Sequence, residues 1–277
     1  MNEIPSWFET IMKKKTHSLS FQNKSFKVVE WSKSEEPTEL VLCLHGFGRN
    51  PEDFETFAHE LKDNERMVAI GFWSHEGSDA FTPKELREGL SVEAWVEQFL
   101  FILNHYGVEK CRLLSYSMGG RLGLMLIQHA GEKITSAKFL ASDGLTRNKL
   151  YAFTVGTLLG RSIANGLKKN GNVVIHFARL LKNLKLLPVK LFRFVEFYMH
   201  ERAMREQVFD VWMGYRRCYP EMKLIAKSIE KNKIPTEFIF GKYDVIIPWK
   251  HGDKLRALTS QINYVKWKVV DKGHRLM

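Results

Sequence analysis

Short apolar runs typical of strands alternate with helix-like stretches along most of the chain, and this alternation limits the fold more than any other feature. Continuous apolar runs at 40–44, 67–70 and 111–114 are typical of strands buried on both faces. Helical periodicity lies between them, for example over 92–103. Repeated strand–helix units predict an α/β fold with a mostly parallel central sheet and helices on both faces.

Other stretches of the chain predict further helices and strands. Polar and apolar residues alternate around a turn at 18–21 and 26–31, which predicts a hairpin at a sheet edge. Pro51 is expected to open a helix that has Phe54, Phe57, Ala58 and Leu61 on one face. An amphipathic stretch at 4–12 is expected to cover an exposed face of the sheet. Further elements are expected at 137–141 (strand), 236–240 (strand), 249–258 (helix) and 264–270 (strand).

The alternation stops over residues 145–219, which we call the insert. The whole chain carries a net charge of +11, and the insert alone holds 14 Lys/Arg against 4 Asp/Glu, a balance of +10. The break in both pattern and charge predicts a basic module, the insert, placed within an α/β core domain formed by 1–144 and 220–277.

Cysteine spacing and hydropathy exclude several classes of protein. Cys43, Cys111 and Cys218 have no CxxC or Cys/His spacing, which argues against a zinc site and a disulfide framework. No secretory signal precedes the first strand, and no uncharged run approaches the roughly 18 residues that a membrane span needs. We therefore expect a cytoplasmic protein without a metal or another cofactor.

The segment Leu113–Gly120 carries the strongest local signal for chemistry. A strand ends and a helix begins around Ser117, with the small residues Ser115 and Gly119 two positions to either side. A sharp turn here forces unusual backbone angles on the central residue, so its neighbours at these positions must be small. The turn would lift the Ser117 hydroxyl above the sheet at the positive end of a helix, where negative charge is favoured.

A serine nucleophile needs a base, an orienting acid and a site for the oxyanion. The loop 45–48 follows an apolar strand, and the backbone N–H groups of Phe47 and Met118 are expected to face the oxyanion. Asp244 and His274 each follow a strand in the last part of the chain.

The motifs HGFG, SxSMGG, GxxDxxxP and a C-terminal GH, in this order, give the chain a plain resemblance to the α/β-hydrolase fold. The resemblance implies a triad with Ser117 as nucleophile, His274 as general base and acid, and Asp244 as the acid that orients the imidazole. It also implies that the insert is a helical cap over the active site. Ser115 departs from the usual G-x-S-x-G elbow, but serine is small enough for the position.

Several other residues leave alternatives open. Asp143, also placed after a strand, is a second candidate for the triad acid. His45 is a candidate for substrate binding, although a role in stabilising its loop is favoured. Arg121 could reach an anionic substrate, although an ion pair with a nearby carboxylate is favoured.

The insert combines cations with large apolar side chains in two expected amphipathic helices, at 177–187 and 191–198. Its charge would attract an anionic ligand, an acidic carrier protein or a negatively charged membrane surface. Nucleic acid is disfavoured because basic and apolar residues alternate and no binding motif is present.

Three functions fit these observations. The first is a serine hydrolase that cleaves a carboxylic ester or thioester, with an anionic or carrier-bound acyl substrate, as in esterases that act on acyl carrier proteins. The second is a lyase, because the stretch 117–121 resembles the elbow of the menaquinone-pathway enzyme that eliminates pyruvate from a succinyl-cyclohexene substrate. The third is a non-catalytic protein that binds a membrane or a partner.

Overall fold

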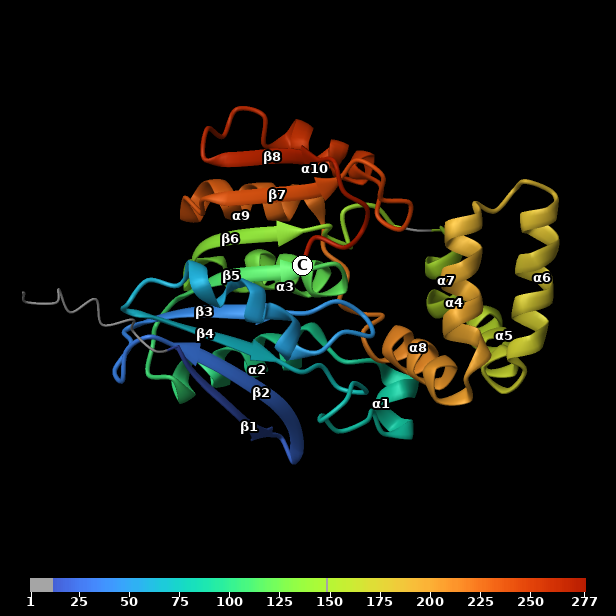
Figure 1. Cartoon of the computed structure of the whole chain (residues 1–277), viewed down its shortest axis with the longest axis horizontal. Helices are drawn as coiled ribbons and strands as arrows, with labels where there is room; N and C mark the ends of the chain where they lie inside the picture. The colour runs from blue at the N-terminus through green and yellow to red at the C-terminus, as the bar shows by residue number, and fades with distance from the viewer. Residues whose placement is uncertain (1–11, 148) are drawn as a thin grey trace, which may run out of the picture.

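The computed structural model describes residues 12–147 and 149–277, in which eight strands form one sheet in the order β1-β2-β4-β3-β5-β6-β7-β8 (Figure 1). β1 and β2 form an antiparallel hairpin at the sheet edge, β2 pairs antiparallel with β4, and every later pairing is parallel. The mostly parallel sheet and its edge hairpin are as predicted. The strands are β1 Lys13–Phe21, β2 Lys24–Ser32, β3 Glu39–Leu44, β4 Glu65–Ile70, β5 Cys111–Tyr116, β6 Ile134–Leu140, β7 Thr236–Gly241 and β8 Val265–Val270.

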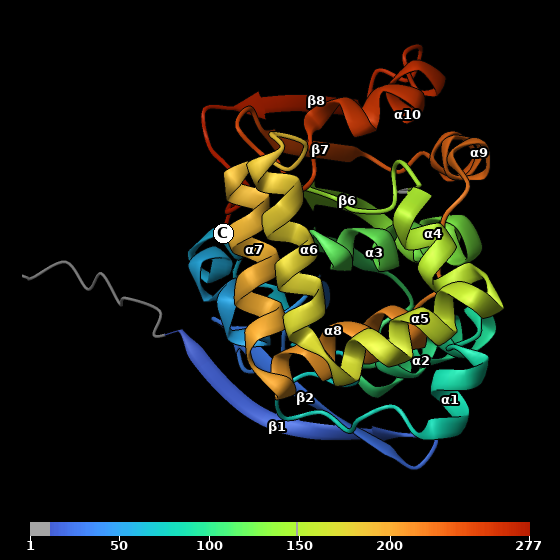
Figure 2. The ribbon, with the colours of Figure 1, turned by 90° about the vertical axis from the view of Figure 1, so that its right-hand side faces the viewer.

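Helices cover both faces of the sheet (Figures 1 and 2). The helix expected from Pro51 forms, but it is a 3-10 helix, η1. Of its expected apolar face, Phe54, Ala58 and the C-cap Leu61 are buried, and Phe57 is partly buried. Outside the insert the helices are η1 Pro51–Glu60, α1 Pro83–Glu88, α2 Val92–His105, α3 Met118–Ala130, η2 Gly131–Lys133, α9 Met222–Asn232, η3 Trp249–Gly252 and α10 Asp253–Leu258.

The core lies in two layers, one on each face of the sheet. On the face covered by α2, α3, α9 and α10, the rings of Phe139, Phe238 and Trp267 stack with centroid distances of 4.9 and 4.1 Å. On the opposite face, Phe54 of η1 packs in a second cluster with Trp31. Met12 contacts this second cluster, whereas residues 4–11 of the amphipathic stretch lie outside the described residues.

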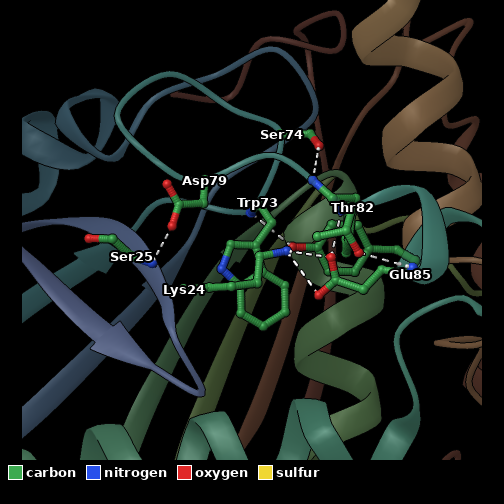
Figure 3. Close-up of polar contacts among 9 residues, drawn as sticks. Lys24, Ser25, Trp73, Ser74, Asp79, Thr82 and Glu85 are labelled. Carbon is green, nitrogen blue, oxygen red and sulfur yellow. Dashed lines mark hydrogen bonds and ion pairs between the residues drawn. The ribbon is translucent and has the colours of Figure 1, made fainter.

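The tip of the edge hairpin is bound to the loop after β4 and to α1, the helix that follows this loop (Figure 3). Lys24 Nζ lies 2.9 Å from Glu85 Oε2 and 4.5 Å from the centre of the Trp73 ring. The backbone N–H of Ser25 donates to Asp79 Oδ2 at 2.7 Å. Charged hydrogen bonds and a cation over an aromatic face are among the stronger polar contacts. They attach the loop, which also reaches the candidate site, to the rigid sheet.

The insert folds into helices that lie beyond the carboxyl ends of the parallel strands (Figures 1 and 2). Buried residues such as Ile175, Met199 and Phe209 form its own apolar cluster. α8 approaches the core closely, since a Cβ on Gly214 would overlap the Phe81 ring. The helices of the insert are α4 Lys149–Gly156, α5 Leu158–Lys169, α6 Gly171–Asn183, α7 Val189–His200 and α8 Arg202–Gly214.

The cysteines are all buried and free. Cys43 and Cys111 lie in strands β3 and β5, as their apolar surroundings predict, and Cys218 follows α8. Burial raises the pKa of each thiol, that of Cys218 to about 12. Among residues 12–147 and 149–277, no helix is long and apolar enough to cross a lipid bilayer.

Candidate active site

Ser117 occupies a strained turn between β5 and α3, as the sequence predicts. Its backbone has φ 51° and ψ −117°, a conformation that L-residues rarely adopt. The glycines that follow it allow this turn to pack: a Cβ on Gly119 would overlap the carbonyl oxygen of Leu44, and one on Gly120 would overlap the Ser142 hydroxyl. The helix α3 can therefore begin directly against β3, with the Ser117 side chain at its N-terminus.

Ser115, which stands where related elbows have glycine, fits because Gly123 leaves room for it. A Cβ on Gly123 would lie 2.7 Å from Ser115 Oγ, so any other residue at 123 would push this serine away. The Ser115 side chain is fully buried, and its hydroxyl makes no hydrogen bond within the described residues. The extra oxygen is thus accommodated sterically, without a polar partner among these residues.

Three distant side chains meet at the carboxyl ends of the strands. Ser117 Oγ lies 3.1 Å from His274 Nε2, and His274 Nδ1 lies 2.7 Å from Asp244 Oδ2. Nδ1–H donates to the carboxylate, so Nε2 is free to accept the serine proton. The structure therefore brings Ser117, His274 and Asp244, as singled out from the sequence, into one hydrogen-bonded chain.

Neighbouring backbone groups hold the acid of this chain. Asp244 Oδ1 accepts hydrogen bonds from the amides of Ile246 and Ile247, at 2.8 and 2.9 Å. The Asp244 side chain is fully buried, whereas that of His274 is 18% exposed. The second oxygen of the carboxylate is left to bind the imidazole.

The short segment after β8 is attached to the core at His274 and at the residues that follow it. The Tyr116 hydroxyl donates to the His274 carbonyl at 3.1 Å, and the two rings lie 5.3 Å apart. Leu276 and Met277 pack against the apolar cluster on the η1 face of the sheet. The imidazole is thus positioned without a further helix after β8 among the described residues.

The loop after β3 lies beside the nucleophile. A Cβ on Gly46 would be 3.1 Å from Ser117 Cβ, so the backbone of the loop passes close to the nucleophile just before Phe47. Met118 is the first residue of α3, where a backbone N–H has no partner inside the helix. The use of the Phe47 and Met118 amides as oxyanion donors stays a prediction.

An aromatic residue of the insert packs on this loop. The Phe47 and Tyr198 rings lie 5.0 Å apart, and a Cβ on Gly48, whose φ is +63°, would come within 2.6 Å of the Tyr198 hydroxyl. A glycine is therefore needed at position 48 both for its backbone conformation and for the approach of α7. The sequence contained no signal for Tyr198, because the contact joins segments 150 residues apart.

Two buried histidines, His45 and His75, form hydrogen bonds that stabilise the loop after β3. His45 donates from Nδ1 to the Gly46 carbonyl at 2.7 Å and accepts at Nε2 from the Phe72 amide at 3.2 Å. His75 Nε2 accepts from the Gly48 amide at 3.3 Å. Both nitrogens of His45 are engaged and the residue is fully buried, which supports the loop-stabilising role rather than substrate binding. His75, which has no motif in the sequence, joins the loop after β4 to the site.

These histidines make stability depend on acid. Burial lowers the pKa of His75 from 6.5 to about 4 and that of His45 well below its usual value. The unfolded chain binds more protons than the folded one below pH 6.5, so stability falls as the pH falls toward 4. We expect His75 alone to remove about 2 kcal/mol of unfolding free energy at about pH 5. Urea unfolding at pH 7 and 5 measures this loss.

The matched comparison is between His75→Gln and His129→Gln, since His129 is exposed on α3. In the His75 variant, the difference in unfolding free energy between pH 7 and pH 5 should be smaller than in the wild type by about 2 kcal/mol. In the His129 variant this difference should equal that of the wild type. Equal pH dependence in both variants would contradict the assignment.

Arg121 and Asp143 pair with each other. The Arg121 side chain is only 3% exposed; its Nε lies 3.6 Å from Asp143 Oδ2, and its Nη1 donates to the Tyr151 hydroxyl at 2.9 Å. The ion pair with a carboxylate, which was favoured over substrate binding, is therefore present. Asp143, the alternative triad acid, is engaged with Arg121, while Asp244 contacts the imidazole.

A cavity of about 400 Å³ lies away from this site. Residues such as Arg112, Ser136 and Thr236 line it, and they belong to the beginnings of β5, β6 and β7. Ser117 and Asp244 follow the ends of strands. The cavity and the triad are thus at opposite ends of the sheet.

The fold and this arrangement define the class of the protein. The family model of the alpha/beta hydrolase fold matches residues 39–277, and the chain belongs to this family. The match begins at β3, so the edge hairpin lies outside it.

Two curated relatives are similar in sequence. One is the dihydrolipoyllysine-residue acetyltransferase component of the acetoin cleaving system of Pseudomonas putida, 25% identical over 78% of this chain and 55% of its own length. The other is a putative 2-succinyl-6-hydroxy-2,4-cyclohexadiene-1-carboxylate synthase of Bacillus subtilis (strain 168), 29% identical over 36% of this chain and 35% of its own. The chain thus matches about half and a third of these relatives.

Solved structures share the fold. MGS-M2, an alpha/beta hydrolase enzyme from a Medee basin deep-sea metagenome library, superposes with a TM-score of 0.65 at 14% identity, over 93% of this chain and 90% of its own. A thioesterase domain from the curacin biosynthetic pathway has a TM-score of 0.61 at 15% identity, over 95% of each chain. Together with the family match, these neighbours show the alpha/beta hydrolase fold.

Proposed function

We propose that the protein is a serine hydrolase that cleaves a carboxylic ester or thioester. The hydrogen-bonded chain from Ser117 through His274 to Asp244 carries this proposal. A buried acid, an imidazole that it orients and a hydroxyl at a helix N-terminus are the groups that acyl transfer requires.

In the proposed reaction, Ser117 Oγ attacks the acyl carbonyl while His274 Nε2 takes the hydroxyl proton. Asp244 stabilises the imidazolium, and the amides of Phe47 and Met118 bind the oxyanion. Collapse of the tetrahedral intermediate breaks the bond to the alcohol or thiol, which leaves with the proton from His274. Water then attacks the acyl-enzyme by the same route and releases the acid.

The insert would form the cap of the active site and a second domain, with the core comprising 1–144 and 220–277. The contact of Tyr198 with Phe47 supports this role, because it brings α7 onto the loop beside the nucleophile. The balance of +10 over the insert favours an anionic or carrier-bound acyl substrate. The name of the P. putida relative refers to acetyl transfer on a protein residue, which agrees with a carrier-bound acyl group.

A lyase is the second candidate, and the similarity to the B. subtilis synthase favours it. In this case the same triad would abstract a proton instead of forming an acyl-enzyme. The resemblance included Arg121, but this arginine is buried and paired with Asp143. Its engagement supports the hydrolase over a lyase that would use Arg121 to hold a polyanion.

Labelling with a fluorophosphonate probe tests the proposal. We expect the wild-type protein to be labelled, Ser117→Ala to lose all labelling, and Ser115→Ala, two residues away, to keep it. Hydrolysis of p-nitrophenyl esters and acyl thioesters of increasing chain length should disappear with Ser117→Ala. Failure to label the folded wild type would favour a non-catalytic protein, and labelling without hydrolysis of any ester or thioester would favour the lyase.

A further inference from the structure

The helix α6 exposes a continuous apolar stripe. Val173, Phe177, Leu180 and Leu184 are 56, 61, 53 and 59% exposed. Their spacing of four, three and four residues places them on one side of the helix. Ile175 and Ala178, on the other side, are buried. Large apolar side chains are thus directed away from the interior of the insert.

The stripe lies at the outer limit of the molecule. α6 is the helix of the insert farthest from the sheet, with α7 beside it (Figures 1 and 2). The turn between these helices adds Leu186, which is 70% exposed, and α7 begins with Val189, which is 56% exposed. Exposed apolar side chains that follow one another along α6 and the turn after it mark an interaction site.

Cations are frequent in the sequence of these helices. From Leu158 to His200 the sequence holds eight Lys/Arg and a single acidic residue, Glu196. Lys185 and Arg193 are exposed, and Arg179 is half exposed beside Glu196, with 3.5 Å between Nη2 and Oε1. A net charge of +7 over this stretch accompanies the apolar side chains.

Charge and shape together indicate the kind of partner. A second copy docking through the same patch would bring two strongly positive surfaces together, and like charges repel. An acidic protein would satisfy the cations, but its carboxylates would lose water against the leucine and phenylalanine side chains. An anionic lipid bilayer accepts both: phosphate groups meet the cations, and acyl chains receive the apolar stripe.

We propose that α6 and the turn that follows it dock onto the surface of an anionic lipid bilayer. The stripe would lie in the layer between headgroups and acyl chains, parallel to the membrane. Tyr198 of α7 would then link this docked surface to the loop beside Ser117. The docking does not depend on the proposed hydrolase activity, and Ser117→Ala should bind vesicles as the wild type does.

Co-sedimentation with vesicles tests the proposal. We expect the protein to bind vesicles of phosphatidylcholine with about one third phosphatidylglycerol at least tenfold more tightly than phosphatidylcholine vesicles. Phe177→Ser combined with Leu180→Ser should weaken binding at least tenfold. The matched control is Leu100→Ser combined with Leu224→Ser, because these exposed leucines lie on α2 and α9. The control should bind normally.

A charge-reversal pair separates the electrostatic part. Lys185→Glu combined with Arg193→Glu should weaken binding to anionic vesicles about tenfold or more. Lys223→Glu combined with Lys227→Glu, on α9, is the matched control and should bind much as the wild type does. Circular dichroism and hydrolysis of a soluble ester establish that each variant is folded.

Three results would overturn the proposal. One is a wild-type protein that binds neither kind of vesicle. Another is normal binding by the Phe177/Leu180 variant. The third is a different occupant: a dimer in analytical ultracentrifugation that the serine substitutions dissociate, or binding of a polyglutamate peptide without binding of vesicles.

Discussion

Replacing Asp244 with asparagine is expected to lower kcat for ester hydrolysis about 10⁴-fold. The amide side chain can still accept the hydrogen bonds from Ile246 and Ile247, so the loop should keep its shape. It cannot stabilise an imidazolium at His274, and its N–H groups favour the wrong tautomer. KM should change little because Asp244 lies behind the histidine. Steady-state kinetics on a p-nitrophenyl ester, with circular dichroism as a check of folding, measure both effects.

Asp143→Asn is the matched control, since Asp143 is the other acid considered for the triad. It pairs with Arg121 and its Oδ1 accepts from the Gly144 amide at 2.7 Å. We expect this substitution to reduce stability, because it leaves a buried guanidinium without its carboxylate. Catalysis per folded molecule should change only a few fold. A large loss of kcat in Asp143→Asn with little loss in Asp244→Asn would reverse the two assignments.

Replacing Gly119 with alanine is expected to destabilise the fold by about 3 kcal/mol or more. The added Cβ would overlap the Leu44 carbonyl and lie 2.6 Å from that of His45. These atoms belong to the backbone of β3 and its loop, so no side chain can rotate to relieve the overlap. Urea unfolding monitored by tryptophan fluorescence measures the loss, and a variant that does not fold at all is the extreme of the same outcome.

Gly166→Ala provides the contrast. Gly166 lies inside α5 and has open space where a Cβ would be. Alanine there should stabilise the protein by about 0.5–1 kcal/mol, because it restricts the unfolded chain and favours the helix. If the two glycine variants had similar stability, the close packing of α3 against β3 would be refuted.

The sheet could be predicted because local patterns specify it. Continuous apolar runs identified the parallel strands, and alternation around a turn identified the β1–β2 hairpin. Three groups of the candidate site were also visible, since Ser117, Asp244 and His274 each sit in a short motif at the end of a strand. The family match and the fold confirm the α/β-hydrolase class that these motifs predicted.

What the sequence could not predict depends on contacts between distant segments. Tyr116 is adjacent to the nucleophile, but its bond to the His274 carbonyl spans 158 residues. Tyr198 and His75 reach the loop after β3 from α7 and from the loop after β4, and neither carries a motif. Such contacts are set by tertiary structure, which a local pattern does not record.

The buried cysteines make the protein suitable for site-directed spectroscopy. Thiol reagents need an accessible thiolate, and burial with a raised pKa withholds it at Cys43, Cys111 and Cys218. Maleimide dyes would therefore react at newly introduced surface thiols while the native ones stay silent. Donor and acceptor dyes placed by His200→Cys and Lys223→Cys would report the separation of α7 and α9 in the otherwise unaltered chain.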